Sequence, residues 1–443
     1  MRQPSIGIRR EDKNQWEVRA PLTPVQAAEL VRRHGIRIIV QPYPRRAFKD
    51  EEYVAAGCEI REDLGDCNLV LGIKEMPAGF FRPGGVYAFF AHVIKGQPHN
   101  MGMLRRMMEL SCSLIDYEKI TDDSGRRLVF FGRFAGLAGM IDTLAALGRR
   151  LEFEGKKTPL GKVKGALAYK DLAEAKGELA ETGREIREEG LPEDVVPLVI
   201  GVAGYGNVAK GVFEILDALG AEEIQPEELF GLASSASRKT VYRVTFREEH
   251  TVTPIQAGRV FNLQEYYQHP ERYRSQFERF LPYLTVLVNC IYWEAKYPRL
   301  VTKSWLRQAY ESGRKPKLMV IGDISCDIEG AIEATVKATN PGAPVFVYDP
   351  VTDIALDGIE GNGPVILAVD NLPCELPVDA SQEFGRALLP FVPALAQTDF
   401  SLSLDQLGLP GELLRALILH RGRLTPDFEF IERFLHSDRK GAR

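Results

Sequence analysis

The 443-residue chain lacks the sequence features of several large classes of protein. Its longest apolar runs have the length of a strand, well short of the ~20 residues that a membrane-spanning helix requires. It has no block of Lys and Arg, and its formal net charge of −5 argues against a nucleic-acid or anionic-membrane partner. Its first residues, MRQPSIGIRREDKNQWE, become charged before an apolar run can form, so we do not expect a signal peptide. These absences predict a soluble, cytoplasmic protein with small-molecule partners, and leave a homo-oligomer open.

Cysteine pairs are missing as well. The six cysteines lie far apart and form no Cys-x-x-Cys motif, which fits neither a zinc site nor a disulfide framework. We therefore expect reduced thiols and no metal site. The cysteines are Cys58, Cys67, Cys112, Cys290, Cys326 and Cys374.

Short apolar runs alternate with helical patterns along the first part of the chain. The chain exceeds the length that one hydrophobic core usually supports, so two domains are expected. Helical residues follow the first run, with Thr23 as a helix cap, Pro24 in the first turn and Gly35 after the last. Strand, helix and strand in this order predict βαβ units and a parallel sheet. The expected strands are 5–8, 36–41, 68–73 and 86–91.

A second α/β unit begins further along the chain. Residues 151–193 are charged and helix-prone, and they precede the most strand-like run of the sequence, VVPLVIGVA at 195–203. Further buried strands are expected at 284–289, 318–322 and 345–347. The sequence therefore predicts an α/β protein with two Rossmann-like domains built on parallel sheets.

A glycine-rich turn follows the strand-like run. Gly204, Gly206 and Ala209 fit the pattern Gly-x-Gly-x-x-Ala, in which the first glycine permits a tight turn and the second admits a pyrophosphate. The following helix offers its N-terminal N–H groups to the phosphates. The motif alone also fits a purely structural turn, but a strand before it and an amphipathic helix after it favour a dinucleotide.

The choice of dinucleotide depends on charges beyond the turn. An acid ~20 residues on usually binds the ribose of NAD, but counting from Gly204 leads to Gln225 at the expected strand end. Arg238 and Lys239 follow and are suited to a 2′-phosphate, although they also fit a solvated surface. NADP is therefore the favoured cofactor, and NAD is the alternative.

Ionisable residues end two neighbouring strands of the first domain. LVLGIKEMP ends its strand at Lys74, and VYAFFAHVIKGQ ends its strand at His92. The carboxyl ends of parallel strands share one edge of a sheet, so both side chains could serve one site and shuttle protons there. The alternatives are a structural histidine in the core and a surface lysine. Arg19, Arg126 and Arg127 are suited to substrate carboxylates, or to an ordinary charged surface.

Several motifs occur in a fixed order along the chain. They are EDKNQWEVRAPLTP, LGIKEMP, YAFFAHVIKGQ, LIDYEKITDDSGRRLVFFGRFAG, VAGYGNVAKG, LVNCIYWE, IGDISCDIEG and AVDNLPCELPVDAS. Together they resemble the lysine–ketoglutarate reductase part of the bifunctional lysine-degrading enzyme of animals and plants and, more distantly, the fungal lysine-forming saccharopine dehydrogenase. Wider relatives are alanine dehydrogenase and transhydrogenase. The resemblance runs from about residue 5 to 388, and the tail after it is expected to form amphipathic helices that pack on the first domain.

The resemblance implies a domain plan and site roles. It implies a substrate domain at 1–150, a dinucleotide-binding domain at 151–365, a segment at 366–443 that returns to the first domain, and an active-site cleft between the domains. Lys74 and His92 would be the catalytic acid–base pair. The substrate residues would be Arg19, Gln97, Glu118, Arg127 and Phe131. Besides Arg238, the cofactor residues would be Gly204, Gly206, Cys290, Ile291, Tyr292, Asp323, Ile324 and Ser325.

The activity implied by the resemblance is a condensation followed by a reduction. The ε-amine of lysine would attack 2-oxoglutarate, and hydride from NADPH, or alternatively NADH, would reduce the imine to saccharopine, reversibly. One alternative is an amino-acid dehydrogenase of the alanine type that uses ammonia. Another is a non-catalytic dinucleotide sensor.

Overall fold

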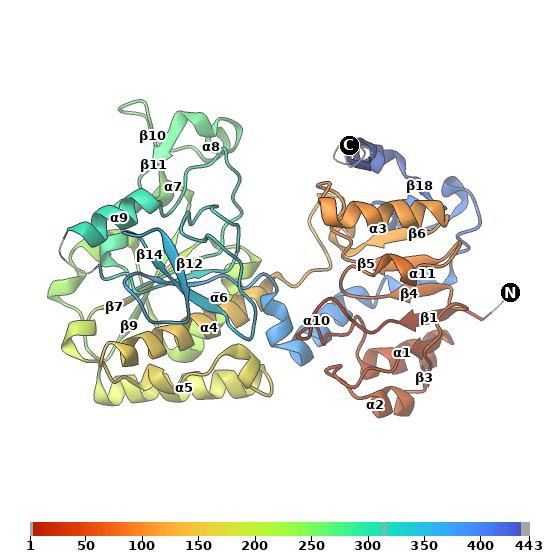
Figure 1. The fold of residues 1–443 in the computed structure, drawn as a ribbon, viewed down its shortest axis with the longest axis horizontal. Helices are drawn as coiled ribbons and strands as arrows, with labels where there is room; N and C mark the ends of the chain where they lie inside the picture. Colours follow the sequence, from red (N-terminus) through yellow and green to blue (C-terminus); the bar gives the residue numbers. More distant parts are fainter. Residues whose placement is uncertain (1–2, 313–315, 436–443) are drawn as a thin grey trace. The chain divides into compact units, whose positions relative to one another are not determined.

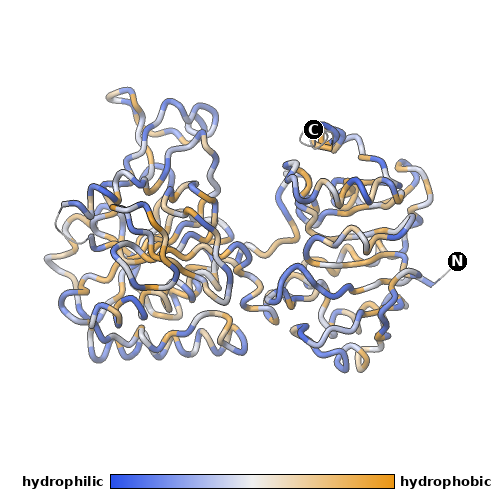
Figure 2. The backbone as a smooth tube through the Cα atoms, viewed as in Figure 1, coloured by the Kyte–Doolittle hydropathy of each residue, from blue (hydrophilic) through white to orange (hydrophobic). Residues whose placement is uncertain are grey.

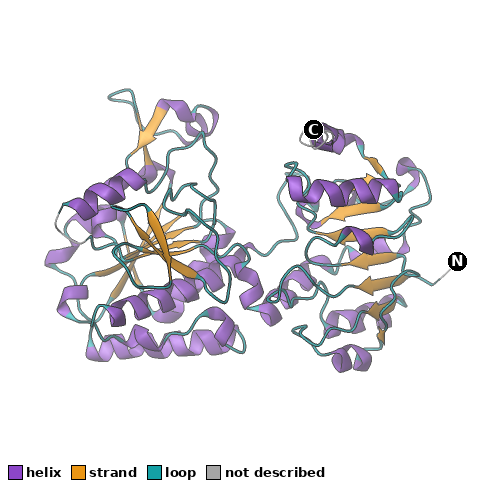
Figure 3. Cartoon of the chain, viewed as in Figure 1, coloured by secondary structure: helices purple, strands orange, loops and turns teal. Residues whose placement is uncertain are grey.

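The computed structural model describes residues 3–312 and 316–435, and these fall into two compact units. Unit 1 comprises Met1–Phe131 and Pro377–Arg443, and unit 2 comprises Gly132–Leu376. Each unit has a central sheet with helices packed on it (Figures 1 and 3). Hydrophobic residues are concentrated in the interior of each unit (Figure 2). Within the described residues, no helix combines the length and apolar character needed to cross a membrane.

Unit 1 is built on an eight-stranded sheet with the order β18-β17-β6-β5-β4-β1-β2-β3. The first six strands in sequence pair in parallel, and the expected strands of the N-terminal half are confirmed as β1, β2, β4 and β5. The strands are β1 (Ser5–Ile8), β2 (Arg37–Val40), β3 (Glu59–Ile60), β4 (Leu69–Leu71), β5 (Val86–Phe89), β6 (Ser113–Asp116), β17 (Leu417–His420) and β18 (Arg423–Leu424).

The C-terminal segment adds two antiparallel strands to this sheet. We expected only helices after residue 388, but β17 pairs with β6 and β18 pairs with β17. The first three residues of β17 are apolar and buried, and only His420 at its end is polar. A strand buried on both faces has no polar alternation, so its sequence is easily mistaken for a buried helix.

The helices of unit 1 follow the expected local signals where these are strong. The side chain of Thr23 caps α1 in a capping box with Gln26, and Gly35 ends the helix with a left-handed φ of 62°. The helices of unit 1 are α1 (Pro24–His34), α2 (Asp50–Ala55), α3 (Pro98–Glu109), α10 (Pro377–Leu388), α11 (Val392–Gln397), α12 (Gly411–Leu414) and α13 (Glu432–Leu435).

Unit 2 contains a second eight-stranded sheet, with the order β15-β14-β16-β13-β12-β7-β9-β8. Its central strand β7 pairs in parallel with β12 on one side and β9 on the other, and β14 and β15 are antiparallel. The strands are β7 (Leu198–Ala203), β8 (Glu222–Ile224), β9 (Val241–Phe246), β12 (Val286–Asn289), β13 (Val320–Asp323), β14 (Val345–Asp349), β15 (Ile354–Asp357) and β16 (Val365–Leu367).

The long helix α4 (Gly132–Phe153) belongs to unit 2, so the chain leaves unit 1 at Phe131 rather than near residue 150. Glycines let α4 approach its neighbour α6 (Asn207–Leu219) closely. A Cβ atom on Gly136 would lie 1.8 Å from the Val208 carbonyl oxygen, and one on Gly211 would lie 2.1 Å from that of Arg133. The remaining elements are α5 (Leu172–Glu189), α7 (Glu248–Thr251), α8 (Leu263–Gln268), α9 (Lys303–Glu311) and a two-stranded ribbon of β10 (Val252–Pro254) and β11 (Tyr273–Ser275).

Candidate functional site

Charged side chains gather at the carboxyl edge of the sheet in unit 1. They come from the segments that follow β1, β4 and β5, which are close together because these strands lie near one another in the sheet. We call this group the acid–base cluster. Its members are Glu11, Lys13, Glu17, Arg19, Lys74, Glu75 and His92.

Glu75 holds the imidazole of His92. Its Oε1 lies 2.7 Å from His92 Nδ1, and its Oε2 accepts a hydrogen bond from Lys13 Nζ at 2.8 Å. Burial alone would raise the pKa of Glu75, but the hydrogen bonds from His92 and Lys13 outweigh burial and hold this pKa well below its ordinary value. A carboxylate accepts, so Nδ1 carries the proton. The proton that His92 exchanges with a substrate would therefore be on Nε2.

Lys74 is partly buried in a charged environment next to Glu75. Burial lowers the pKa of its ammonium group, and the nearby positive charge of Arg19 lowers it further, while Glu17 acts in the opposite direction. The backbone N–H groups of Ile73 and Lys74 donate to the Glu11 carboxylate at 2.7 and 3.0 Å, which fixes the turn after β4. A lysine with a lowered pKa can accept and return a proton near neutral pH.

Arg19 forms a fully buried ion pair with Glu17. Its Nε and Nη2 donate to the two carboxylate oxygens at 2.7 and 2.5 Å, and the two side chains are 1% and 0% exposed. The guanidinium lies over the ring of Phe131, with Cζ 4.2 Å from the ring centre, and that ring stacks on Phe384 at 4.5 Å. Two donors of Arg19 are therefore already bound to a carboxylate of the protein. The charge of this arginine acts on Lys74.

The other predicted substrate residues lie after β5 and β6. Arg127, which is about half exposed, forms an ion pair with Glu118. Gln97 precedes α3, and its buried Oε1 has no hydrogen-bond partner among the described residues. The structure thus brings Lys74, His92, Arg19 and Phe131 into one group of contacts. It places Arg127 and Glu118 in a separate, more exposed pair.

Three acids of the cluster were not predicted from the sequence. Glu75 directly follows Lys74, and Glu11 and Glu17 lie in the same N-terminal motif as Arg19. Burial raises the pKa of Glu11 to about 7, and the negative charge of Glu17 contributes to the rise. The sequence feature that could have predicted these acids is their position close to the expected bases along the chain, because buried charges require a partner of opposite charge.

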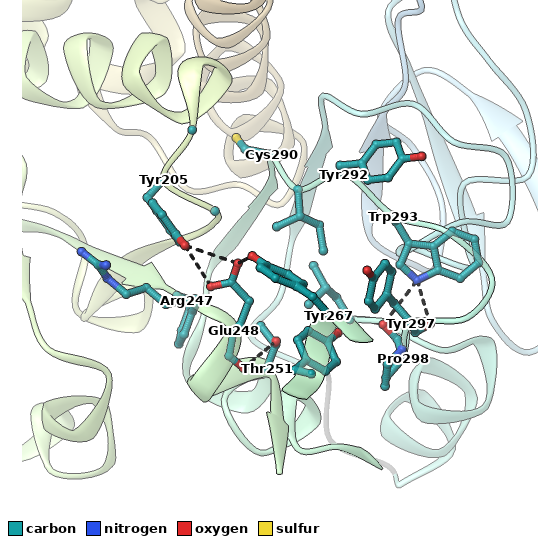
Figure 4. A pocket seen from close by; sticks show the side chains of 16 residues that line it. Tyr205, Arg247, Glu248, Thr251, Tyr267, Cys290, Tyr292, Trp293, Tyr297 and Pro298 are labelled. Atoms are coloured by element: carbon teal, nitrogen blue, oxygen red, sulfur yellow. Dashed lines mark hydrogen bonds between the residues drawn. The ribbon is translucent and has the colours of Figure 1, made fainter. Parts of the chain in front are cut away.

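A second candidate site is a cavity of about 490 Å³ at the carboxyl edge of the sheet in unit 2. Residues that follow β7, β9 and β12 line it, together with two tyrosines of α8 (Figure 4). Seven of its sixteen lining residues are aromatic, and we call it the aromatic cavity. Its residues are Gly204, Tyr205, Gly206, Phe246, Arg247, Glu248, Thr251, Tyr266, Tyr267, Cys290, Ile291, Tyr292, Trp293, Tyr297, Pro298 and Leu300.

The glycine turn at the cavity has the geometry that a pyrophosphate requires. Gly204 has a φ of +105°, and a Cβ there would lie 3.2 Å from Ile291 Cγ2 and 3.3 Å from the Cys290 backbone. A Cβ on Gly206 would meet nothing within 4 Å, so the space above the turn is open. Gly206 is also the N-cap of α6 and brings no side chain to cap its N–H groups. The turn and the cavity fit a dinucleotide.

The predicted cofactor residues after β12 and β13 have different positions. Cys290, Ile291 and Tyr292 line the aromatic cavity. Asp323 instead accepts hydrogen bonds from Asn289 Nδ2 at 2.9 Å and Thr335 Oγ1 at 2.6 Å, and burial raises its pKa to about 6. Ile324, next to it, is buried beneath Gly139 of α4. Ser325 Oγ donates to the Ile291 carbonyl at 2.6 Å, so Ser325 stabilises a residue of the cavity wall without lining the cavity itself.

The predicted cofactor residue Arg238 lies away from the glycine turn. Arg238 precedes β9, and its Nε donates to the Leu191 carbonyl at 2.8 Å. Because β9 runs parallel to β7, with Leu198 paired to Val241, Arg238 lies at the sheet edge opposite the glycine turn. Counting about 20 residues on from Gly204 to find the ribose-binding position led to Gln225, which follows β8. That strand is not next to β7, so Gln225 does not stand beside the glycine turn. The residue that follows β9 at the correct edge is Arg247.

Two family models match the chain, and they identify its class. The model described as alanine dehydrogenase/PNT, N-terminal domain, matches residues 7–138, and the corresponding C-terminal domain model matches residues 271–427. The chain belongs to the alanine dehydrogenase/PNT family. Its fold is similar to that of an L-alanine dehydrogenase, with a TM-score of 0.61 at 19% identity, covering 97% of this chain and 99% of the other.

Within this family, the chain is most informatively compared with two groups of relatives. It is 39% identical to alpha-aminoadipic semialdehyde synthase of Arabidopsis thaliana and 35% identical to the mitochondrial synthase of Bos taurus, over 99% of its own length in both cases. These alignments cover 42% and 48% of the synthases, so the chain spans less than half of their length. It is 25% identical to saccharopine dehydrogenase [NAD(+), L-lysine-forming] of Yarrowia lipolytica, over 88% of this chain and 92% of that protein.

Proposed function

We propose that this protein is an oxidoreductase that condenses lysine with 2-oxoglutarate and reduces the imine to saccharopine with a nicotinamide dinucleotide. The observation that carries the proposal is the acid–base cluster, where Glu75 orients His92 and a partly buried Lys74 has a lowered pKa. The glycine turn of unit 2 supports the need for a dinucleotide, which supplies the hydride when bound. The name of the saccharopine dehydrogenase relative, which includes the formation of L-lysine, supports lysine and saccharopine as the reacting amine and product.

The proposed chemistry requires several proton transfers. The lysine amine must lose a proton to attack the 2-oxo carbon, and the resulting hydroxyl must gain one to leave as water. Saccharopine, the oxidised dinucleotide and water are then formed from lysine, 2-oxoglutarate, the reduced dinucleotide and one proton. In our proposal Lys74 accepts the amine proton, and His92 Nε2 donates a proton to the leaving hydroxyl.

Substrate carboxylates need cationic partners, and we assign this role to the arginine whose side chain is the more exposed. Arg127 is about half exposed and paired with Glu118, so it can exchange that partner for a substrate carboxylate. Arg19 is fully buried and bound to Glu17, so we assign it the task of lowering the pKa of Lys74. Gln97, Glu118 and Phe131 remain proposed substrate residues, and Gln97 Oε1 offers an acceptor to an ammonium or hydroxyl group.

The direct test measures the oxidation of NADPH and of NADH at 340 nm. 2-Oxoglutarate is added first and lysine second, and the product is identified by mass spectrometry. We expect oxidation only when both substrates are present. Oxidation with pyruvate and ammonia, and none with lysine, would instead identify an amino-acid dehydrogenase of the alanine type. Dinucleotide binding without turnover on any amine would indicate a non-catalytic sensor.

A further inference from the structure

Arg247 is the first residue after β9, and it lies beside the glycine turn. Phe246, the last residue of β9, pairs with Ala203, and its carbonyl accepts a hydrogen bond from the Gly204 N–H at 3.0 Å. In nicotinamide-binding α/β sheets, the end of the strand next to the glycine turn is the place where the ribose 2′ position is recognised. An acid there binds the 2′-hydroxyl of NAD, whereas this chain has an arginine.

The guanidinium of Arg247 is available to an anion. The side chain is exposed and lines the aromatic cavity, with Cζ 4.7 Å from the ring centre of Tyr205. Across residues 3–312 and 316–435, its guanidinium forms no ion pair with a carboxylate. A guanidinium that lies on an aromatic ring keeps its in-plane N–H donors directed outward, which suits a phosphate.

The neighbouring acid, Glu248, is already bound within the protein. Its carboxylate accepts hydrogen bonds from Tyr205 Oη at 3.2 Å and from Tyr267 Oη at 2.6 Å (Figure 4). Burial raises the pKa of both phenols, and the negative charge of Glu248 contributes in each case, so both phenols remain donors. Glu248 thus fixes the ring of Tyr205, and Tyr205 in turn supports Arg247.

We propose that Arg247 binds the 2′-phosphate of NADP(H) and gives the protein its preference for this cofactor over NAD(H). Tyr205, held by Glu248, is the positioning residue for the guanidinium, and Tyr267 holds Glu248 in turn. The proposal rests on the proposed function only in requiring that the ligand is a nicotinamide dinucleotide. It does not depend on which amine or 2-oxo acid reacts.

The test measures dissociation constants of NADP⁺, NAD⁺ and 2′,5′-ADP for the full chain by isothermal titration calorimetry. We expect the wild type to bind NADP⁺ more tightly than NAD⁺. Arg247→Ala should weaken the binding of NADP⁺ and 2′,5′-ADP by about 10–100-fold, the usual loss for charge-assisted hydrogen bonds. It should change the dissociation constant of NAD⁺ by less than about threefold. Arg247→Lys should retain part of the NADP⁺ affinity, since it keeps the charge but not the planar fork.

Arg238→Ala is the matched control, because it removes an arginine at the opposite edge of the same sheet. It should leave both affinities unchanged, and thermal melts of all variants would establish that they fold. A wild type that prefers NAD⁺, or an Arg247→Ala variant that loses both cofactors equally, would overturn the proposal. Because binding is measured without substrates, a failure of the lysine reaction would leave this result unaffected.

Discussion

The two sheets have the same kind of carboxyl edge, but different side chains follow their strands. In unit 1 the segments after β1, β4 and β5 carry acids and bases that bind one another, as in the pairs Glu75–His92 and Glu17–Arg19. In unit 2 the segments after β7, β9 and β12 carry glycines and aromatic residues, and an open cavity of about 490 Å³ remains. Buried, paired charges shift pKa values, whereas an open apolar cavity accommodates a ligand.

This comparison suggests a division of labour. Proton transfer requires groups whose pKa values have been moved, and the acid–base cluster of unit 1 contains such groups in Lys74 and Glu11. Dinucleotide binding requires free N–H groups, a turn without side chains and apolar surfaces for the rings, which the aromatic cavity of unit 2 offers. Substitutions in one unit should therefore change one function and leave the other intact.

The largest effect is expected at Lys74. Lys74→Met removes the proposed proton acceptor and should lower kcat by about 10²–10⁴-fold, while the dissociation constant of the dinucleotide stays the same. His92→Gln should behave similarly. Steady-state kinetics and calorimetry on each variant measure the two quantities. Lys95→Met, at an exposed lysine three residues after His92, is the control and should keep normal turnover. Near-normal turnover of a Lys74→Met/His92→Gln double variant would refute the assignment.

The next largest effect concerns the stability of unit 1. Glu17→Ala leaves the buried guanidinium of Arg19 without its carboxylate and should cost about 3–5 kcal/mol of unfolding free energy. Urea denaturation followed by circular dichroism measures the loss. Glu118→Ala is the matched control, because it leaves the half-exposed Arg127 unpaired and should cost less than about 1 kcal/mol. Equal losses of unfolding free energy in the two variants would contradict the prediction that the buried ion pair contributes more to stability than the exposed pair.

The third effect is a pH dependence that arises from Glu11. Its pKa in the folded protein, about 7, lies above the ordinary value of 4.5, so the folded state binds the proton more tightly than the unfolded chain does. The stability gained from this proton is complete below the ordinary value and is lost as the pH rises through about 7. Each pKa unit corresponds to about 1.4 kcal/mol, so Glu11→Gln should reduce the stability lost between about pH 5 and pH 8 by roughly 2–3 kcal/mol.

Urea unfolding measured at several pH values tests the prediction for Glu11. Glu222→Gln, at an exposed acid in β8 of unit 2, is the control and should leave the pH dependence unchanged. If the unfolding free energy changed with pH equally in the wild type and in Glu11→Gln, Glu11 would not hold a proton near neutral pH.

The smallest effect is expected at the glycine turn. Gly204→Ala forces an alanine into a φ of +105° and places its Cβ against Ile291 and Cys290, so the turn should shift and the dinucleotide should bind about tenfold more weakly. Calorimetric titration with NADP⁺ measures this change. Gly231→Ala is the control, since its φ is −112° and its Cβ would meet no atom within 4 Å. Unchanged binding by Gly204→Ala would argue against a pyrophosphate at this turn.

Local sequence signals predicted much of the fold. The α1 helix has the expected cap at Thr23 and end at Gly35, and the turn at Gly204 follows β7 as its motif requires. The strands β17 and β18 were missed, because β17 pairs with β6 from a position about 300 residues later in the chain and β18 then pairs with β17. No local pattern specifies such a pairing.

The candidate site was predicted less completely. Lys74 and His92 were chosen because they end apolar strands, and the structure places both beside Glu75. The sequence did not show that Arg19 is bound to Glu17, because the ion pair depends on burial and side-chain direction. The sequence thus allowed the acids and bases of the candidate site to be chosen by residue type, but it did not show which residues they bind in the folded protein.

The sequence by itself determined the alternation of strands and helices, the glycine turn, and the supply of acids and bases at the strand ends, because these depend on neighbouring residues along the chain. The tertiary structure decided that β9, rather than β8, lies next to β7, and so that Arg247, rather than Arg238, stands beside the turn. It also decided which charges are buried and therefore which pKa values change. Strand pairing and desolvation both depend on residues far apart in the sequence, and only folding brings these together.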